Sequence, residues 1–205
     1  MILPIGITCN AATELKRLGL RRCSYPFDWV STSLTTISTL LMKVIQMSHS
    51  DIERFCRQDL FHESNGYTTL LPYKKQYYFV NRGYKLSFTH DHEPLEDACT
   101  KYIRRFKRLR DDVIASTSIV LVFVSVSNSY DEELYDLLEQ LGNLFPEKTI
   151  SLVSVNGFAK PIQNDRITNC CIYYDKSFED TNSTWQKTEY VSFVNWTLKE
   201  YFYGE

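Results

Sequence analysis

The thiol of Cys9 is the side chain whose position in the sequence points most clearly to chemistry. It stands after a short apolar run that ends at Gly6, and a stretch with helical spacing follows it directly. A thiol at the N-terminal end of a helix is stabilised as the nucleophilic thiolate by the helix dipole and by free backbone N–H groups. Cysteine is also among the most buried residue types, so a small core residue is the competing interpretation.

A cysteine nucleophile needs a base, usually histidine, and a third group that holds the imidazole in one orientation. His90 and His92 are the candidates that stand out, because the stretch Thr89-His90-Asp91-His92-Glu93 places two histidines and two carboxylates at the end of a β-like segment. These side chains are also plausible metal ligands, although their spacing matches neither HExxH nor a Cys/His zinc site. An exposed polar loop is the third interpretation. We expect no metal.

Motifs that would indicate other enzymes are absent. Neither GxGxxG nor GxxxxGKS/T occurs in this chain, which has 7 glycines, so we find no phosphate-binding loop and expect no cofactor. GxSxG is absent as well, which disfavours a serine hydrolase of the α/β type.

The composition is that of an ordinary globular protein. Of 205 residues, 43% are hydrophobic and 23% are charged, and no apolar run approaches the roughly 18 residues that cross a bilayer. The net charge of -2 provides no general attraction for nucleic acid. We therefore expect neither a membrane nor a nucleic acid as a partner.

The cysteines indicate the compartment. The chain has 6 of them without a CxxC pair, and its N-terminus lacks the pattern of a signal peptide. This usage is typical of free thiols in a reducing environment. We expect a cytoplasmic protein, located in the host cytoplasm if its source is viral.

A basic segment suggests a second kind of function. Six cations lie within ten residues, from Lys101 to Arg110, and acidic residues flank them on both sides. Long basic side chains commonly form a solvated helix face, and we favour that interpretation. The alternative is a non-catalytic binding module in which Arg104 and Arg105 contact a phosphate-bearing or acidic partner.

The elements around Cys9 follow from periodicity and turn chemistry. Residues 2 to 8 suit a short buried strand, and Thr8 or Asn10 is the expected cap of the helix that follows. An irregular segment then closes on Pro26-Phe27-Asp28-Trp29. Its aromatic side chains are large enough to anchor this segment to the core, so Phe27 and Trp29 are predicted to be structural.

The middle of the chain changes from helical to strand patterns. Two helices are predicted first, one capped by Ser31 or Thr32 and one from Asp51 to Leu60 with Asp51 as its cap. From Gly66 to Phe88 the chain is rich in Tyr, Phe, Val and Thr, which predicts short strands in an antiparallel meander. A helix from Glu93-Pro94 to about Arg110 then carries the basic segment.

The last third contains the clearest strand signals. Ser118 to Val126 and Thr149 to Val155 are continuous apolar runs, and a helix capped by Ser129 separates them. Strands that are apolar on both faces and joined by a crossover helix are parallel neighbours in a sheet covered on both sides. A strand at residues 170–174 and a helix at residues 188–202 complete the chain.

These elements predict one α/β domain over residues 1–205, with a layered sheet of parallel central strands, Rossmann-like or esterase-like, flanked by helices. In such sheets, functional residues gather outside the carboxyl ends of the strands. The positions that this rule selects are Thr8 to Asn10, Ser127-Asn128, Asn156-Gly157 and Asp175.

Several blocks of the chain resemble a known family in the same order. The blocks are Gly6-Ile7-Thr8-Cys9-Asn10 with Ala12, Leu15 to Leu20, Ser24 to Trp29, Phe88 to Asp91, Lys101 to Phe106, and the strand from Ile119 to Val126. They are similar to the family described as "putative papain-like cysteine peptidase", which has members in bacteria and in large DNA viruses. The resemblance covers most of the first 155 residues.

The resemblance implies a nucleophile at Cys9 and a base at His90, with Asp91 or Asp28 as an orienting or structural acid. The predicted parallel sheet differs from the antiparallel barrel of papain-like enzymes and puts Cys9 where a layered esterase carries its nucleophile. We therefore expect a cysteine-dependent hydrolase or acyl-transfer enzyme that acts on a peptide or an acyl compound. The backbone N–H groups of Asn10 and Ala11 are expected to stabilise its oxyanion.

Overall fold

The computed structural model of the chain describes residues 1–7, 9–62, 66–71, 76–88, 90–91, 93–125, 130–171 and 184–204. For residues 66–71, 76–78, 184–191 and 193 it describes the backbone alone. Several sequence predictions lie outside the described residues: those on Thr8, Thr89, His92, Ser127, Asn128, Ser129 and Asp175.

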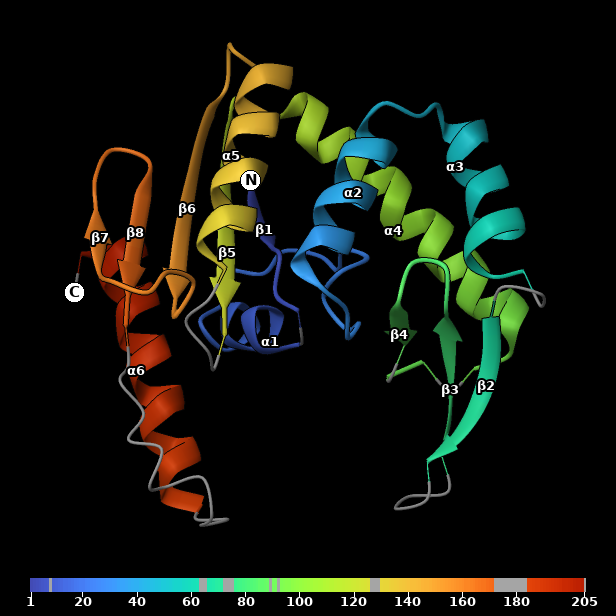
Figure 1. Cartoon of the computed structure of the whole chain (residues 1–205), viewed down its shortest axis with the longest axis horizontal. Helices are drawn as coiled ribbons and strands as arrows, with labels where there is room; N and C mark the ends of the chain where they lie inside the picture. The colour runs from blue at the N-terminus through green and yellow to red at the C-terminus, as the bar shows by residue number, and fades with distance from the viewer. Residues whose placement is uncertain are drawn as a thin grey trace.

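A five-stranded sheet forms the centre of the fold, with the strand order β1-β5-β6-β8-β7 (Figure 1). The strands are β1 (Ile2–Pro4), β5 (Ser118–Val124), β6 (Thr149–Val155), β7 (Ile162–Gln163) and β8 (Ile167–Cys170). Strands β1, β5, β6 and β8 run parallel to one another, and β7 runs antiparallel to β8. The predicted layered sheet with parallel central strands is confirmed.

Helices cover both faces of this sheet. Helices α2 (Leu34–Ile45), α4 (Leu95–Ala115) and α5 (Asp131–Leu144) bury their apolar faces in one core with Leu121 and Phe123 of β5. Helices α1 (Asn10–Arg17) and α6 (Thr184–Tyr203) pack on the opposite face against Val122 and Val124. Successive strand residues point to opposite faces, so the continuous apolar run of β5 supplies both cores.

Two short helical elements extend the first layer. Helix α3 (His49–Phe55) and the π-helical turn η1 (Cys56–Leu60) follow α2 and pack against α4. No helix in the described ranges is both long and apolar enough to span a bilayer.

A second sheet of three antiparallel strands lies beside α3 and α4, away from the central sheet (Figure 1). Its strands are β2 (Gly66–Leu71), β3 (Gln76–Asn81) and β4 (Leu86–Phe88), which confirms the predicted meander. Strand β4 contacts the rest of the fold through backbone hydrogen bonds and aromatic packing. Ser87 exchanges two backbone hydrogen bonds of 2.8 and 2.9 Å with Ser31. The ring of Phe88 packs on Phe61 and Tyr102, with centroid distances of 5.0 and 4.9 Å.

Several predicted helix caps are wrong. Helix α1 has Cys9 as its N-cap residue, where Thr8 or Asn10 was predicted, and Asn10 is the first helical residue. Helix α2 is capped by Ser33, which accepts the Thr36 N–H at 3.2 Å, and not by Ser31 or Thr32. Helix α3 begins after Ser48, which forms a capping box with Asp51, so Asp51 is the third helical residue and not the cap. A capping box satisfies two N–H groups reciprocally, whereas Asp51 alone would satisfy one.

Three other element boundaries differ from the predicted ones. Helix α4 continues beyond the predicted end at Arg110 to Ala115, because Val113 extends the buried face by another turn. Strand β8 begins at Ile167, before the predicted start at residue 170, because its residues pair with Leu152 to Val155 of β6. Strand β1 already ends at Pro4, and Cys9 is the N-cap residue of α1.

Candidate functional site

Cys9 lies between the carboxyl end of β1 and the first turn of α1. Helix α1 packs on one face of the central sheet, whereas α5, which follows the neighbouring strand β5, packs on the other. Figure 1 shows α1 beside the carboxyl end of β5. Neighbouring parallel strands whose following helices part to opposite faces leave a crevice at their carboxyl ends, where ligands bind in open α/β sheets. Cys9 lies at this end of β1, as the N-cap residue of α1.

Cys9 stands next to backbone N–H groups at the start of α1. The residue is partly exposed, and its Sγ forms no hydrogen bond with any residue that the structure describes. Its carbonyl oxygen accepts the Thr13 N–H at 2.9 Å, which starts the helix. The N–H groups of Asn10 and Ala11 lie in the first turn and have no intrahelical acceptor, and no described side chain caps them. An oxyanion beside Cys9 would find its donors there.

His90 follows β4 and has an exposed ring. Its imidazole packs against the indole of Trp29, with ring centroids 5.4 Å apart and ring planes at 66°. Within the described ranges, no carboxylate or amide forms a hydrogen bond with this imidazole. Among the described residues, the ring of His90 has an aromatic contact with Trp29 and no hydrogen bond to an acid.

Asp91 is buried, with 2% of its surface exposed, and it binds to α4. The hydroxyl of Tyr102 donates to its Oδ2 at 2.8 Å, and Lys101 forms an ion pair with its Oδ1. The Asp91 N–H donates to the carbonyl oxygen of Phe88 at 3.2 Å. Both carboxylate oxygens are thus engaged with α4, and Asp91 fixes the backbone next to His90.

Two of the four candidate metal ligands, Asp91 and Glu93, form ion pairs with the same lysine. Lys101 forms ion pairs with both Asp91 and Glu93, so an ammonium group already sits between the two carboxylates. Among the residues that the structure describes, no group of three or more His, Cys, Asp or Glu side chains has metal-binding geometry.

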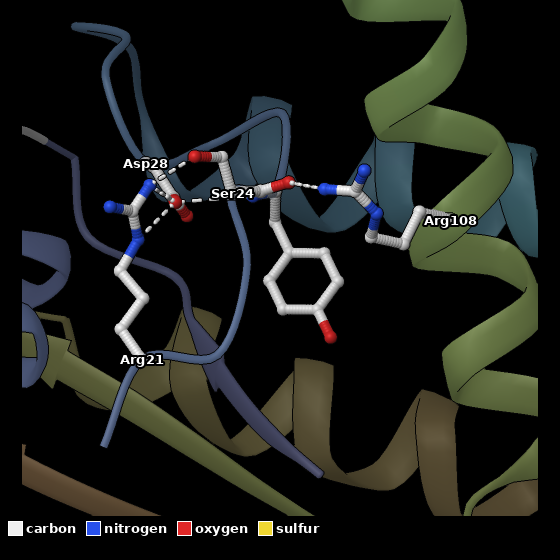
Figure 2. A network of polar contacts seen from close by, with 5 residues as sticks. Arg21, Ser24, Asp28 and Arg108 are labelled. Atoms are coloured by element: carbon white, nitrogen blue, oxygen red, sulfur yellow. Dashed lines mark hydrogen bonds and ion pairs between the residues drawn. The ribbon is translucent and has the colours of Figure 1, made fainter. Parts of the chain in front are cut away.

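Asp28 locks the loop between α1 and α2. It is buried, and its Oδ2 accepts Arg21 Nε–H at 2.8 Å, a second N–H of the same guanidinium, and the Tyr25 N–H at 3.1 Å. Figure 2 shows this guanidinium also reaching Ser24, while Arg108 of α4 approaches Ser24 from the other side. Burial raises the pKa of Asp28, and the charge of Arg21 opposes that rise. No described hydrogen bond joins Asp28 to His90.

The same loop touches both candidate catalytic segments. The Thr32 N–H donates to the carbonyl oxygen of Ile7 at 3.1 Å, two residues before Cys9. Ser31 pairs with Ser87 of β4, and Trp29 packs on His90. No hydrogen bond joins Cys9 to His90 in this structure, so the Cys-His pair stays a prediction.

The basic segment of α4 is largely engaged inside the molecule. Lys107 pairs with Glu53 at 3.2 Å, and Arg108 donates to the Ser24 carbonyl oxygen at 3.1 Å. Arg105 is buried, with its guanidinium carbon 5.0 Å from the centroid of the Tyr102 ring. Arg104 is exposed to solvent and forms no ion pair with a described residue. The two arginines predicted to share one binding role thus have different environments.

The other thiols provide a comparison for Cys9. Burial raises the pKa of the Cys56, Cys99 and Cys171 thiols, which keeps them protonated and slow to react. Cys23 and Cys170 are partly exposed, as Cys9 is. These two are therefore the appropriate internal standards for the reactivity of Cys9.

The candidate position at the end of β6 is closed by packing. Asn156 is buried and has a φ of 55°, a left-handed conformation that asparagine tolerates. The Gly157 N–H donates to Asn169 Oδ1 at 3.1 Å, and a Cβ at Gly157 would lie 2.8 Å from Leu134 Cδ1. Asn156 and Gly157 therefore shape a tight turn.

A cavity of about 430 Å³ lies along the outer edge of β1. Its lining combines apolar residues of β1 and α1 with the polar side chains Arg21, Arg22, Cys23, Tyr25 and Asp112. Cys9 and His90 do not line it, although Arg21 joins it to the loop that carries Trp29.

Two residues linked to His90 in the structure are not among the predicted site residues. Trp29, which contacts the imidazole, is predicted from the sequence to be structural, and Arg21, which contacts Trp29, has no predicted role. The aromatic-rich sequence of residues 25–29 and the charged pair Arg21-Arg22 before it were visible signals. Their link to His90 depends on the long-range pairing of Ser31 with Ser87, which no local pattern indicates.

Together, the parallel sheet and the partly exposed thiol at a helix N-terminus define a layered α/β protein with a candidate nucleophile at a strand end. The chain belongs to the family described as "Putative papain-like cysteine peptidase (DUF1796)", which matches residues 1–157. This membership makes it a peptidase-like hydrolase in coarse terms and confirms the family resemblance. The match includes Cys9, Asp28, His90 and Asp91.

A curated viral protein is similar over much of this chain. It is an uncharacterized protein of Acanthamoeba polyphaga mimivirus, 29% identical over 161 residues, which cover 67% of this chain and 70% of the viral protein. No solved structure matches significantly.

Proposed function

We propose that this protein is a cysteine-dependent hydrolase or acyl-transfer enzyme in which Cys9 is the nucleophile and His90 the base. The observation that carries this proposal is the placement of Cys9 between the carboxyl end of β1 and the first turn of α1, next to the N–H groups of Asn10 and Ala11, which no described side chain caps. The substrate class that fits is a peptide or an acyl compound with an accessible carbonyl group.

The proposed reaction has two halves. Cys9 Sγ bonds to the carbonyl carbon of the substrate while His90 takes the thiol proton, and the N–H groups of Asn10 and Ala11 bind the negative oxygen. The leaving group departs with the proton from His90, which leaves a thioester on Cys9. Water, or another acceptor, then attacks the thioester, gives its proton to His90 and releases the acyl group, and the thiol takes that proton back.

The cellular setting belongs to the proposal. All six cysteines are free thiols in the structure, and a thiol nucleophile needs a reducing environment to stay active. We place the protein in the cytoplasm, which is the host cytoplasm if its source is viral.

Iodoacetamide labelling at pH 6.5 to 8, followed by mass spectrometry of each cysteine peptide, tests this function. Cys9 is expected to react about tenfold or more faster than Cys23 and Cys170, because its thiolate is stabilised at the helix N-terminus and by His90. His90→Ala should slow the labelling of Cys9 about tenfold, toward the rate of these two standards.

Thermal melting of the His90→Ala variant serves as the folding control. The ring of His90 is exposed and forms no hydrogen bond with a described residue, so the melting temperature should change little. Equal labelling of Cys9, Cys23 and Cys170 in the wild type, or an unchanged Cys9 rate in His90→Ala, would disprove the proposal.

A second candidate function uses the outer face of α4. A shallow cleft of about 510 Å³ there is lined by Arg104 and Lys107, together with Thr100, Ile103, Arg108, Asp111 and Asp112. The exposed guanidinium of Arg104 forms no ion pair with a described residue. This face fits a phosphate-bearing or acidic partner without any need for Cys9.

Binding of a fluorescent polyglutamate peptide and of a phosphoserine peptide tests the second candidate. Arg104→Glu is expected to raise the Kd about tenfold, and the affinity should fall with salt, because the contact is a surface charge pair. Lys16→Glu on the exposed side of α1 is the matched charge-reversal control. Arg105 is unsuitable for reversal because it is buried. Equal effects of both reversals would reject a specific site.

A further inference from the structure

Hydrogen bonds between residues of the loop from Arg21 to Thr32 fix the conformation of this loop. Arg21 donates two N–H groups to Asp28 Oδ2, one of them at 2.8 Å, and a third contact of 2.6 Å to Ser24 Oγ (Figure 2). The Tyr25 N–H donates to the same Asp28 oxygen at 3.1 Å. Because Asp28 is buried, these bonds are shielded from competing water.

The loop is also fixed to α4. Arg108 donates to the Ser24 carbonyl oxygen at 3.1 Å, and the Tyr25 hydroxyl donates to Asp112 Oδ2 at 2.7 Å. The buried ring of Phe27 packs edge-on against Phe106, with centroids 6.1 Å apart. The loop therefore has little freedom to move relative to the helix.

Trp29 projects from this fixed loop and contacts two side chains. The guanidinium carbon of Arg21 lies 5.2 Å from the centroid of the indole, and the imidazole of His90 lies 5.4 Å from it. Arg21 thus binds Asp28 and stacks on Trp29 at the same time. The orientation of the indole is determined by the same guanidinium that closes the loop.

The backbone of His90 is fixed from the other side. Asp91 binds Tyr102 and Lys101 of α4, and β4 is paired through Ser87 to Ser31. These contacts do not restrict the exposed imidazole, which can still rotate about its two side-chain torsions. Trp29 is the described residue that packs against that ring.

We propose that Trp29, held by Arg21, is a positioning residue that sets the orientation of the His90 imidazole. It does so by an aromatic contact, in the role that a hydrogen-bonded acid or amide has in other cysteine and serine hydrolases. This inference rests on the proposed function, because the orientation of His90 matters for catalysis only if His90 serves Cys9.

Two readouts test the inference with Trp29→Ala, Trp29→Phe and the control Trp196→Ala, which removes an exposed tryptophan of α6. The first is the rate of Cys9 labelling by iodoacetamide. We expect Trp29→Ala to fall about tenfold, to the rate of His90→Ala, while Trp29→Phe stays within about threefold of the wild type because it keeps an aromatic ring. Trp196→Ala should label like the wild type.

The second readout is the imidazole proton resonance of His90 by NMR, which depends on the indole and not on Cys9. Ring current from Trp29 should displace this resonance in the wild type, and the displacement should vanish in Trp29→Ala, with no change in Trp196→Ala. The displacement in the wild type reports the contact directly, even if Trp29→Ala loses its labelling through partial unfolding.

The outcomes separate the two proposals. If His90→Ala slows Cys9 labelling but Trp29→Ala does not, the positioning role is wrong and the proposed function stands. If His90→Ala has no effect on labelling, the proposed function fails, and with it the catalytic meaning of the Trp29 contact. An unchanged His90 resonance in Trp29→Ala overturns the inference whatever the labelling shows.

Discussion

Replacing Asp91 with alanine is expected to lower the free energy of unfolding by about 3 kcal/mol. The carboxylate is 2% exposed, accepts a hydrogen bond of 2.8 Å from Tyr102 and pairs with Lys101. Without it the Tyr102 hydroxyl stays buried and unsatisfied, which costs about 1–3 kcal/mol by itself. The loss stays at the lower end for a broken buried ion pair because Lys101 keeps its second partner, Glu93.

Urea denaturation followed by circular dichroism measures this change, and a double-mutant cycle shows its origin. Tyr102→Phe alone should cost about 1 kcal/mol, since it removes the hydroxyl together with its hydrogen bond. The double variant Asp91→Ala with Tyr102→Phe should lose less free energy of unfolding than the two single variants lose together, because no unsatisfied hydroxyl remains. A loss of less than about 0.5 kcal/mol in Asp91→Ala, the range of ordinary surface substitutions, would contradict the anchoring role.

The fate of Asp91 also shows what the sequence could not reveal. From the sequence it was an orienting acid for His90, a metal ligand or a structural acid, and all three interpretations require only a carboxylate near a histidine. The choice depends on how α4 docks, because that docking places Lys101 and Tyr102 against Asp91. The periodicity of a sequence predicts which side chains are buried, but it does not predict which side chain of another element each one contacts.

Periodic features, in contrast, were predictable. The stripe of Leu34, Ile37, Leu40, Leu41, Val44 and Ile45 in α2 is entirely buried, and β6 runs over the predicted residues Thr149–Val155. Helical and strand periodicity reports burial directly, so the layers follow from it. Caps are less predictable, since Ser31, Thr32 and Ser33 have similar chemistry and only the docked geometry selects Ser33.

The candidate site was predictable from the sequence only in part. The position of Cys9 at a strand-to-helix turn follows from local patterns, and the structure has it as the N-cap residue of α1. The contact of Trp29 with His90 joins residues far apart in the chain and exists because Ser31 pairs with Ser87. Long-range pairing of this kind is set by the packing of the whole fold.

Phe88→Ala is expected to have the largest effect on stability, a loss of about 3–5 kcal/mol. The ring is 1% exposed and sits between Phe61 and Tyr102, at centroid distances of 5.0 and 4.9 Å. Truncation removes both ring contacts and leaves a cavity where β4 meets α4. Helix and strand residues around this position are already fixed by other contacts, so they can collapse into the cavity only in part.

The comparison with Phe88→Leu and Ile114→Ala shows whether packing explains the loss. Leucine fills much of the cavity, so Phe88→Leu should lose about 1–2 kcal/mol. Ile114 is 44% exposed, and its truncation should change the unfolding free energy by less than about 1 kcal/mol. Because Phe88 lies two residues before His90 and helps to fix β4 against α4, Phe88→Ala should also slow Cys9 labelling, whereas Ile114→Ala should not. Equal stability losses in Phe88→Ala and Ile114→Ala would show that β4 is not packed against α4 as the structure has it.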